Sequence, residues 1–220
     1  MDVQRGQDTD RTSTPTQSWG RSEYRPAQED MQHQTGVRTR TKIALLNIKG
    51  QMSGSLNKWH HVPRLMRDLQ IGVLVVQETH LTAELAAEFN GLFENSHELI
   101  HSLDPGSRNA RGVAFVLNKR LVRTNDLKME VLVPGRAILL SIPWRNDSRL
   151  VILNIYVPNV PGETREFWSK VQNGLQVAHS LKPDIMLGDF NLVEDALDRI
   201  PCSQGDPQAT ELLREIWTSL

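Results

Sequence analysis

Hydrophobic residues along this chain of 220 amino acids arrive in short clusters that begin abruptly at Ile43. Residues 1–40 are rich in Arg, Asp, Gln, Thr and Ser and contain almost no aliphatic side chains. Such a segment buries too little apolar surface to offset the conformational entropy lost on ordering. We therefore predict a disordered tail over residues 1–40 and one folded domain over residues 41–220.

From Ile43 onward, strand-like and helix-like patterns alternate. Short apolar runs bounded by turn residues are typical of strands, and apolar positions three and four residues apart are typical of helices. The expected strands span 43–48, 73–78, 98–103, 112–117, 136–142, 149–157 and 184–187, and the expected helices span 57–70, 82–89, 163–179 and 207–220. Thr82 is a predicted N-cap, and Pro63 is predicted to mark a kink or first turn. This alternation indicates an α/β fold.

Polar side chains stand at the ends of three of these strands. Asn47 lies at the end of the first, Glu78 at the end of the second, and Asp189 and Asn191 follow the buried-looking run 184–187. Catalytic groups of open α/β folds tend to lie at strand ends. We therefore expect these strands to deliver their polar groups to one edge.

Composition and charge narrow the classes of partner. The formal net charge is -1, so a polyanion would have to be held by a local basic patch or a metal ion. Cys202 is the only cysteine, which rules out an internal disulfide and a cysteine-rich zinc site. The longest apolar runs fall far short of the roughly 20 residues that span a bilayer, and the first residues lack the apolar stretch of a secretion signal. We expect an intracellular protein with no membrane partner, and composition sets no oligomeric state.

Four segments occur in the order found in one superfamily: LNIKG at 46–50, VQETH at 76–80, NIYVPN at 154–159 and LGDFN at 187–191. Together they resemble the endonuclease/exonuclease/phosphatase superfamily, and in particular its apurinic-type endonucleases. The intervening segments 111–119, 134–136 and 193–201 are similar to the endonuclease part of non-LTR retrotransposon polyproteins, especially fungal ones. The resemblance extends from about Thr41 to the end of the chain.

The resemblance implies a four-layer α/β sandwich, in which two β-sheets pack face to face with helices outside. It also implies Mg²⁺-dependent (or Mn²⁺-dependent) hydrolysis of a phosphodiester, with DNA nicked for retrotransposon insertion. A nuclear location would follow if the chain acts on DNA.

The residues themselves suggest how such a reaction would run. Hydrolysis of a phosphodiester requires a hard cation, and Mg²⁺ takes oxygen ligands such as one or two carboxylates. Glu78 is the expected metal ligand with Asn47 beside it, whereas an isolated strand-end glutamate is more often a solvated carboxylate. Asp189 is suited to orient or deprotonate the attacking water, and Asn191 to donate to the phosphoryl oxygens. The alternative for both is a turn that caps the strand.

Donors and cations for the phosphate are expected nearby. The Tyr156 phenol can donate to a phosphate oxygen or the leaving group, with Asn159 as a second donor, although a tyrosine here can equally be a core residue. Backbone phosphates need local cations. The candidates are Arg111 and Arg199, with Arg136 and Arg165 in addition, and Asp198 and Arg199 are also suited to pair and shape their loop.

The chain departs from the family pattern at two places. Lys49 stands where related nucleases carry an acid, and no histidine follows His179, although the family has a C-terminal Asp-His pair that polarises the water. A chain that lacks its C-terminal strands and this pair would bind metal and phosphate but turn over poorly. Two alternatives therefore stand beside the nuclease: a phosphatase of the same fold acting on a small phosphoester, and a non-catalytic remnant of a mobile element.

Overall fold

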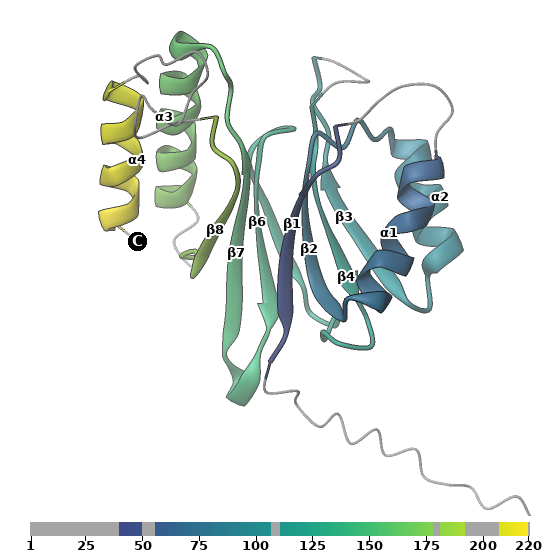
Figure 1. Cartoon of the computed structure of the whole chain (residues 1–220). Helices are drawn as coiled ribbons and strands as arrows, with labels where there is room; N and C mark the ends of the chain where they lie inside the picture. The colour runs from purple at the N-terminus through teal and green to yellow at the C-terminus, as the bar shows by residue number, and fades with distance from the viewer. Residues whose placement is uncertain (1–39, 50–55, 107–110, 178–180, 192–206, 220) are drawn as a thin grey trace, which may run out of the picture. The chain divides into compact units, whose positions relative to one another are not determined.

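The computed structural model of the chain describes residues 40–49, 56–106, 111–177, 181–191 and 207–219 (Figure 1). All of them belong to one compact unit, Val37–Leu220. The predicted tail over residues 1–40 lies outside the described residues except for Arg40, so the predicted domain boundary stays a prediction.

Eight strands form two sheets within the described residues. Sheet A has the order β1-β2-β4-β3 and sheet B the order β5-β6-β7-β8. The strands of sheet A are β1 (Lys42–Asn47), β2 (Ile71–Gln77), β3 (His97–Ser102) and β4 (Val113–Asn118), and those of sheet B are β5 (Lys128–Val133), β6 (Ala137–Pro143), β7 (Arg149–Tyr156) and β8 (Ile185–Asp189). The pairs β1–β2 and β7–β8 are parallel and the other neighbouring pairs are antiparallel.

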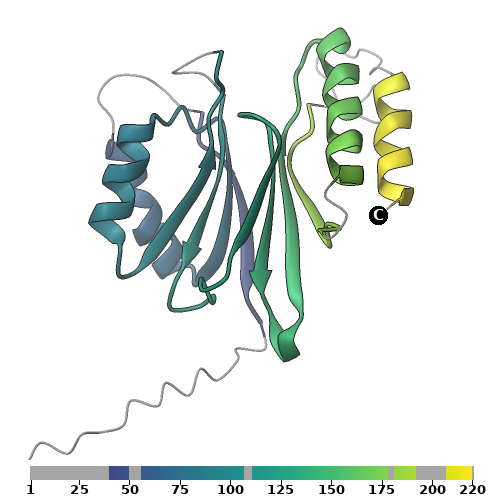
Figure 2. The same cartoon turned by 180° about the vertical axis from the view of Figure 1, so that it is seen from behind.

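Helices cover the outer face of each sheet. Helices α1 (Leu56–Asp68) and α2 (Ala83–Phe93) lie against sheet A, while α3 (Pro161–Val177) and α4 (Pro207–Ser219) lie on the side of sheet B, and Figures 1 and 2 show this from opposite directions. A short 3-10 turn, η1 (Arg145–Asp147), joins β6 to β7. The four-layer α/β sandwich is therefore confirmed.

Alternate residues of a strand face opposite sides of its sheet, and the apolar side chains therefore form three separate layers. In β2, Val73 and Val75 contribute to the layer between the sheets, whereas Leu74 and Val76 contribute to the layer under α1 and α2. Every residue of β2 is buried, because both of its faces are covered. A third layer lies between sheet B and the helices α3 and α4, with Trp168 fully buried in it.

Three details differ from the sequence prediction. Strand β5 was not predicted: it is an edge strand in which three of the six residues are exposed, so its apolar positions give no clear pattern. Helix α2 continues to Phe93, beyond the predicted end at Phe89. Pro63 lies inside α1 rather than in its first turn, so of the two predicted possibilities the kink alone stays a prediction.

The predicted cap of α2 is confirmed, because the Thr82 hydroxyl accepts a hydrogen bond from the Leu85 backbone N–H. Within the described part of the chain, none of the helices is both long and apolar enough to cross a membrane.

Candidate active site at the ends of four strands

The strand ends predicted to carry chemistry meet at one edge of the sandwich. Asn47 ends β1 and pairs in register with Gln77, whose neighbour is Glu78. Tyr156 ends β7 and pairs in register with Asp189 at the end of β8. Both pairs of strands are parallel, so each sheet presents two carboxyl ends side by side. The expectation of one shared edge is confirmed.

Asn47 connects the two acids of this edge. Its Nδ2 donates to Glu78 Oε1 over 2.8 Å and to Asp189 Oδ2 over 3.1 Å. The two carboxylate oxygens are thus separated by no more than the sum of these distances, although they come from different sheets. The Asn47 side chain is held from the other end by the Lys49 backbone N–H, which donates to its Oδ1 over 3.0 Å.

This donor set fits a hard divalent cation. Two carboxylates and an amide offer oxygen ligands only, and Mg²⁺ is commonly held by one or two carboxylates while it keeps several waters. No group of three or more His, Cys, Asp and Glu side chains with metal-binding geometry occurs in the described ranges. Asn47 turns its nitrogen, not its oxygen, toward the acids, so it would become a ligand only after rotation of its amide.

Tyr156 is influenced by both acids of this edge and by Arg136. Burial is the main cause that raises the pKa of Tyr156. The negative charge of Glu78 and the hydrogen bond between the phenol and Glu78 raise this pKa further. The guanidinium of Arg136 lies 5.3 Å from the centre of the Tyr156 ring, and its Nη1 donates to the Tyr156 backbone oxygen over 3.2 Å. The phenol therefore stays protonated and can act as a hydrogen-bond donor.

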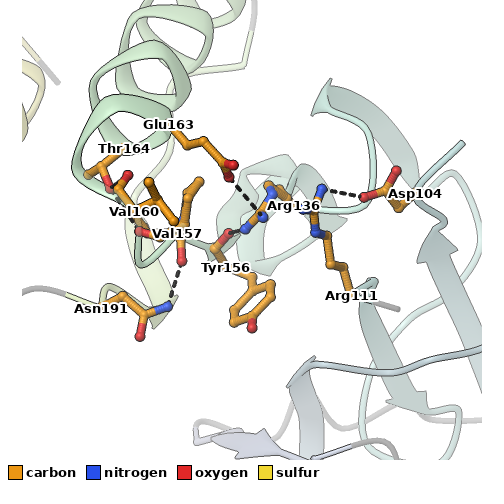
Figure 3. A network of polar contacts seen from close by, with 10 residues as sticks. Asp104, Arg111, Arg136, Tyr156, Val157, Val160, Glu163, Thr164 and Asn191 are labelled. Atoms are coloured by element: carbon orange, nitrogen blue, oxygen red, sulfur yellow. Dashed lines mark hydrogen bonds and ion pairs between the residues drawn. The ribbon is translucent and has the colours of Figure 1, made fainter. Parts of the chain in front are cut away.

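Arg136 belongs to a larger network of charges (Figure 3). Its Nη2 lies 3.9 Å from Glu163 Oε2, at the start of α3. Arg111 donates to Asp104 Oδ2 over 2.8 Å. Burial lowers the pKa of Arg136, and the positive charge of Arg111 is the next cause, so the two cations act on the same region. Arg136 still remains charged at neutral pH, since the ordinary pKa of arginine exceeds about 12.

The loop after β8 is fixed at several points. The Asn191 backbone N–H donates to Asp189 Oδ1 over 3.1 Å, which is the capping turn considered as the alternative for this pair. Asn191 Nδ2 donates to the Val157 backbone oxygen over 2.6 Å, as Figure 3 shows. Phe190, which lies between Asp189 and Asn191 in the sequence, stacks on Trp168 of α3 with 6.4 Å between the ring centroids. Asn191 thus holds the loop against the end of β7.

Left-handed backbone conformations gather at the same edge. Lys49, Glu78 and Asn191 have φ angles of 44°, 50° and 46°. Non-glycine residues adopt this region infrequently and at a cost, and such residues cluster at functional sites. At each of these positions, the chain turns sharply just beyond a strand and directs the site side chains toward one another.

The remaining predicted phosphate ligands are less closely gathered. Asn159 is exposed beyond β7, and Arg165 is exposed on α3, where it donates to Gln208 of α4 over 2.7 Å. Arg199 and its predicted partner Asp198 lie outside the described residues. Sequence reasoning passed over Asp104 and Glu163, because a lone acid carries no local signal that it will pair with a distant arginine.

Comparisons with known proteins support the fold. No family model matches the sequence, and no curated protein is significantly similar to it. Among solved structures, the chain is similar to an AP endonuclease from Archaeoglobus fulgidus, with 18% identity, a TM-score of 0.56, and coverage of 81% of this chain and 70% of that one. It is also similar to the AP endonuclease LMAP from Leishmania major, with 17% identity, a TM-score of 0.59, and coverage of 80% and 65%.

A third similar structure is the 3′ phosphatase NExo (D146N) from Neisseria bound to a product DNA hairpin, with 17% identity, a TM-score of 0.57, and coverage of 80% and 71%. The chain therefore has the fold shared by these endonucleases and this phosphatase, and it spans about two thirds of the length of each structure.

Proposed function

We propose that the chain is a Mg²⁺-dependent phosphodiester hydrolase that nicks DNA, of the type found in non-LTR retrotransposons. The observation that carries this proposal is the contact of one Asn47 nitrogen with carboxylates of both sheets. Two acids held this close repel one another unless a positive group lies between them. Asn47 supplies part of that compensation, and a divalent cation would supply more. The shared fold with DNA-processing enzymes adds support.

Glu78 would hold the metal, with Asp189 facing it and Asn47 turned to offer its oxygen. When bound, Mg²⁺ would neutralise charge on the scissile phosphate. The chain's own residues would set the geometry: Asn47 fixes both carboxylates relative to each other through its hydrogen bonds of 2.8 and 3.1 Å.

Asp189 would orient the attacking water. Each of its oxygens already accepts one hydrogen bond, Oδ1 from the Asn191 backbone and Oδ2 from Asn47. The carboxylate is therefore fixed in position but keeps acceptor capacity for a water proton, as a general base requires. Asn191 would contribute by holding this loop, since its side-chain nitrogen donates to Val157.

Tyr156 would donate its phenolic proton to a phosphoryl oxygen or to the leaving group. Its raised pKa keeps it in the donor form, because burial and the charge of Glu78 disfavour the phenolate. Arg136, which lies over the Tyr156 ring, and Arg111, whose charge acts on Arg136, would attract the flanking phosphates of a polynucleotide, and Asn159 and Arg199 would contact them as well.

A phosphatase is the second candidate, because the same edge would serve a terminal phosphate. The similarity to the Neisseria 3′ phosphatase favours it to the same degree that the other two structures favour an endonuclease.

The test is nicking of supercoiled plasmid by the full chain with Mg²⁺, compared with EDTA, alongside release of phosphate from a 3′-phosphorylated duplex. We expect Mg²⁺-dependent nicking that Glu78→Gln and Asp189→Asn reduce by about 100-fold or more, as expected for a group that acts in the transition state. Glu166→Gln is the matched control, because Glu166 is an exposed acid that pairs with Lys170 on α3. Phosphate release without nicking would favour the phosphatase. Nicking that is unaffected by both site variants would overturn the proposed roles.

A further inference from the structure

A buried pair of side-chain amides joins the two sheets close to the site. Gln77 of β2 and Asn154 of β7 are both fully buried. Gln77 Nε2 donates to Asn154 Oδ1 over 2.8 Å. Asn154 Nδ2 in turn donates to the backbone oxygens of Val76 and Ala114 over 3.2 and 2.9 Å. One side chain of sheet B is therefore bonded to both β2 and β4 of sheet A.

The surroundings of this pair are apolar. The buried hydrophobic residues of the layer between the sheets are aliphatic apart from Phe115, and they include Val75 of β2 and Ile152 of β7. Contacts of this kind are non-directional, so they favour face-to-face packing without fixing how far one sheet is displaced along the other. The three hydrogen bonds of the amide pair are directional and do fix it.

The position of the pair in the sequence ties it to the site. Gln77 immediately precedes Glu78 and is the register partner of Asn47. Asn154 lies two residues before Tyr156 on the same face of β7, and both belong to the side that faces sheet A. A shift between the sheets would therefore move Glu78 and Asn47 together, relative to Tyr156.

Stability does not explain the pair well. Gln77 Oε1 is buried and has no hydrogen-bond partner among the described residues, which is a cost that an aliphatic pair would not carry. Buried polar groups that cost stability are retained in some proteins because they specify one arrangement among several apolar ones. Here the arrangement that they specify is the one that assembles the acid cluster.

We propose that Gln77 and Asn154 are positioning residues that lock the two sheets in the register at which Glu78 meets Tyr156 and Asp189. The role in catalysis rests on the proposed hydrolase function. The geometric role does not, because it concerns the distance between the Glu78 carboxylate and the Tyr156 phenol.

The test uses the double variant Gln77→Met/Asn154→Leu, which removes both amides together, so that neither amide is left without the other. The backbone oxygens of Val76 and Ala114 lose their Asn154 donor in this variant and in the single variant alike. The single variant Asn154→Leu also leaves the Gln77 amide without its Asn154 acceptor, so we expect it to melt at a lower temperature than the double variant. Thr79→Val is the matched control. Thr79 also adjoins Glu78 and is buried, and its hydroxyl has no hydrogen-bond partner among the described residues.

The first readout does not depend on activity. It is a crystal structure of the double variant, compared with that of Thr79→Val. We expect the 3.1 Å contact between Asn47 and Asp189, which joins the two sheets, to be lost in the double variant and kept in Thr79→Val, while the contact between Asn47 and Glu78 within sheet A stays in both. The second readout is plasmid nicking, where kcat or the Mg²⁺ requirement should change by about 10- to 100-fold, the usual effect of residues that orient metal ligands.

A folded double variant that keeps the contact between Asn47 and Asp189 would overturn the inference. Absence of nicking in the wild type would count against the hydrolase function alone, because the crystal structure still decides whether the amide pair fixes one sheet relative to the other.

Discussion

Asn47 Nδ2 donates to Asp189 Oδ2 over 3.1 Å, although the two residues are 142 positions apart in the sequence. Asn47 lies at the end of β1 and Asp189 at the end of β8, the edge strands of two different sheets. The contact thus links the sheets at the candidate active site. Because its acceptor is a carboxylate, its strength depends on the charges around it.

Replacing Asn47 by aspartate should make the stability of the protein depend on Mg²⁺. Asn47→Asp removes the donor shared by Glu78 and Asp189 and adds a third negative charge. In metal-free solution we expect the free energy of unfolding to fall by about 1–2 kcal/mol, the usual effect of lost hydrogen bonds to charged groups in a partly buried place. Saturating Mg²⁺ should raise the stability of the variant more than that of the wild type, by about 2–3 kcal/mol at a hundredfold excess over Kd.

The measurement is the melting temperature with EDTA and with Mg²⁺. Asn90→Asp is the control, because Asn90 is also partly buried and bonds the backbone of Leu99 through both ends of its amide. It should lose stability without rescue by Mg²⁺. Equal responses of the two variants to Mg²⁺ would mean that the edge has no particular affinity for the ion.

Gly188 should tolerate no side chain. A Cβ at this position would overlap the backbone oxygen of Ile155, its register partner on β7. We expect Gly188→Ala to lower the free energy of unfolding by about 2–3 kcal/mol through this overpacking, and to displace Asp189 and so reduce nicking. In contrast, Gly91→Ala should stabilise the protein by about 0.5–1 kcal/mol, because Gly91 lies in α2 and a Cβ added there would enter open space. Urea denaturation of both variants gives the comparison, and a Gly188→Ala variant as stable as the wild type would show that β8 does not approach β7 so closely.

Ionisation of Tyr156 should weaken the fold at alkaline pH. Its pKa in the folded state is raised, first by burial and then by Glu78, above the ordinary value of about 10. The contribution of Tyr156 to stability is therefore complete below that ordinary value and is lost as pH rises toward the folded-state pKa. Denaturation curves at a series of alkaline pH values should fall less steeply for Tyr156→Phe than for the wild type. Parallel curves would show that the phenol is not set apart from solvent.

Protonation of His97 should lower the stability of the fold at acid pH. It is buried, and its pKa is lowered by burial and then by the charges of Arg120 and Arg67. Its stabilising contribution is thus complete above the ordinary histidine pKa of about 6.5 and is lost as pH falls below it. The variant His97→Gln should show a shallower loss of stability between about pH 7 and pH 5. His61→Gln, which changes an exposed histidine of α1, should leave the slope as it is in the wild type.

Most strands and helices, and the polar edge of the sandwich, are encoded locally in the amino-acid sequence. The aliphatic run Val73–Val76 predicts β2, and the polar residues that follow such runs single out Asn47, Glu78 and Asp189 as site residues. Strand and helix periods are local, so each segment carries its own pattern. Where the local pattern is weak, as in the edge strand β5, the sequence did not predict the strand.

The contacts between these groups, in contrast, arise only from the tertiary packing. That one Asn47 nitrogen serves two acids, that Arg136 packs on Tyr156, and that Asn154 bonds β2 and β4 all depend on how two twisted sheets are stacked. These contacts join residues of different elements, in most cases far apart in the sequence. The stacking of the two sheets results from many weak apolar contacts, so no single segment of the sequence indicates which residue of another segment it will contact.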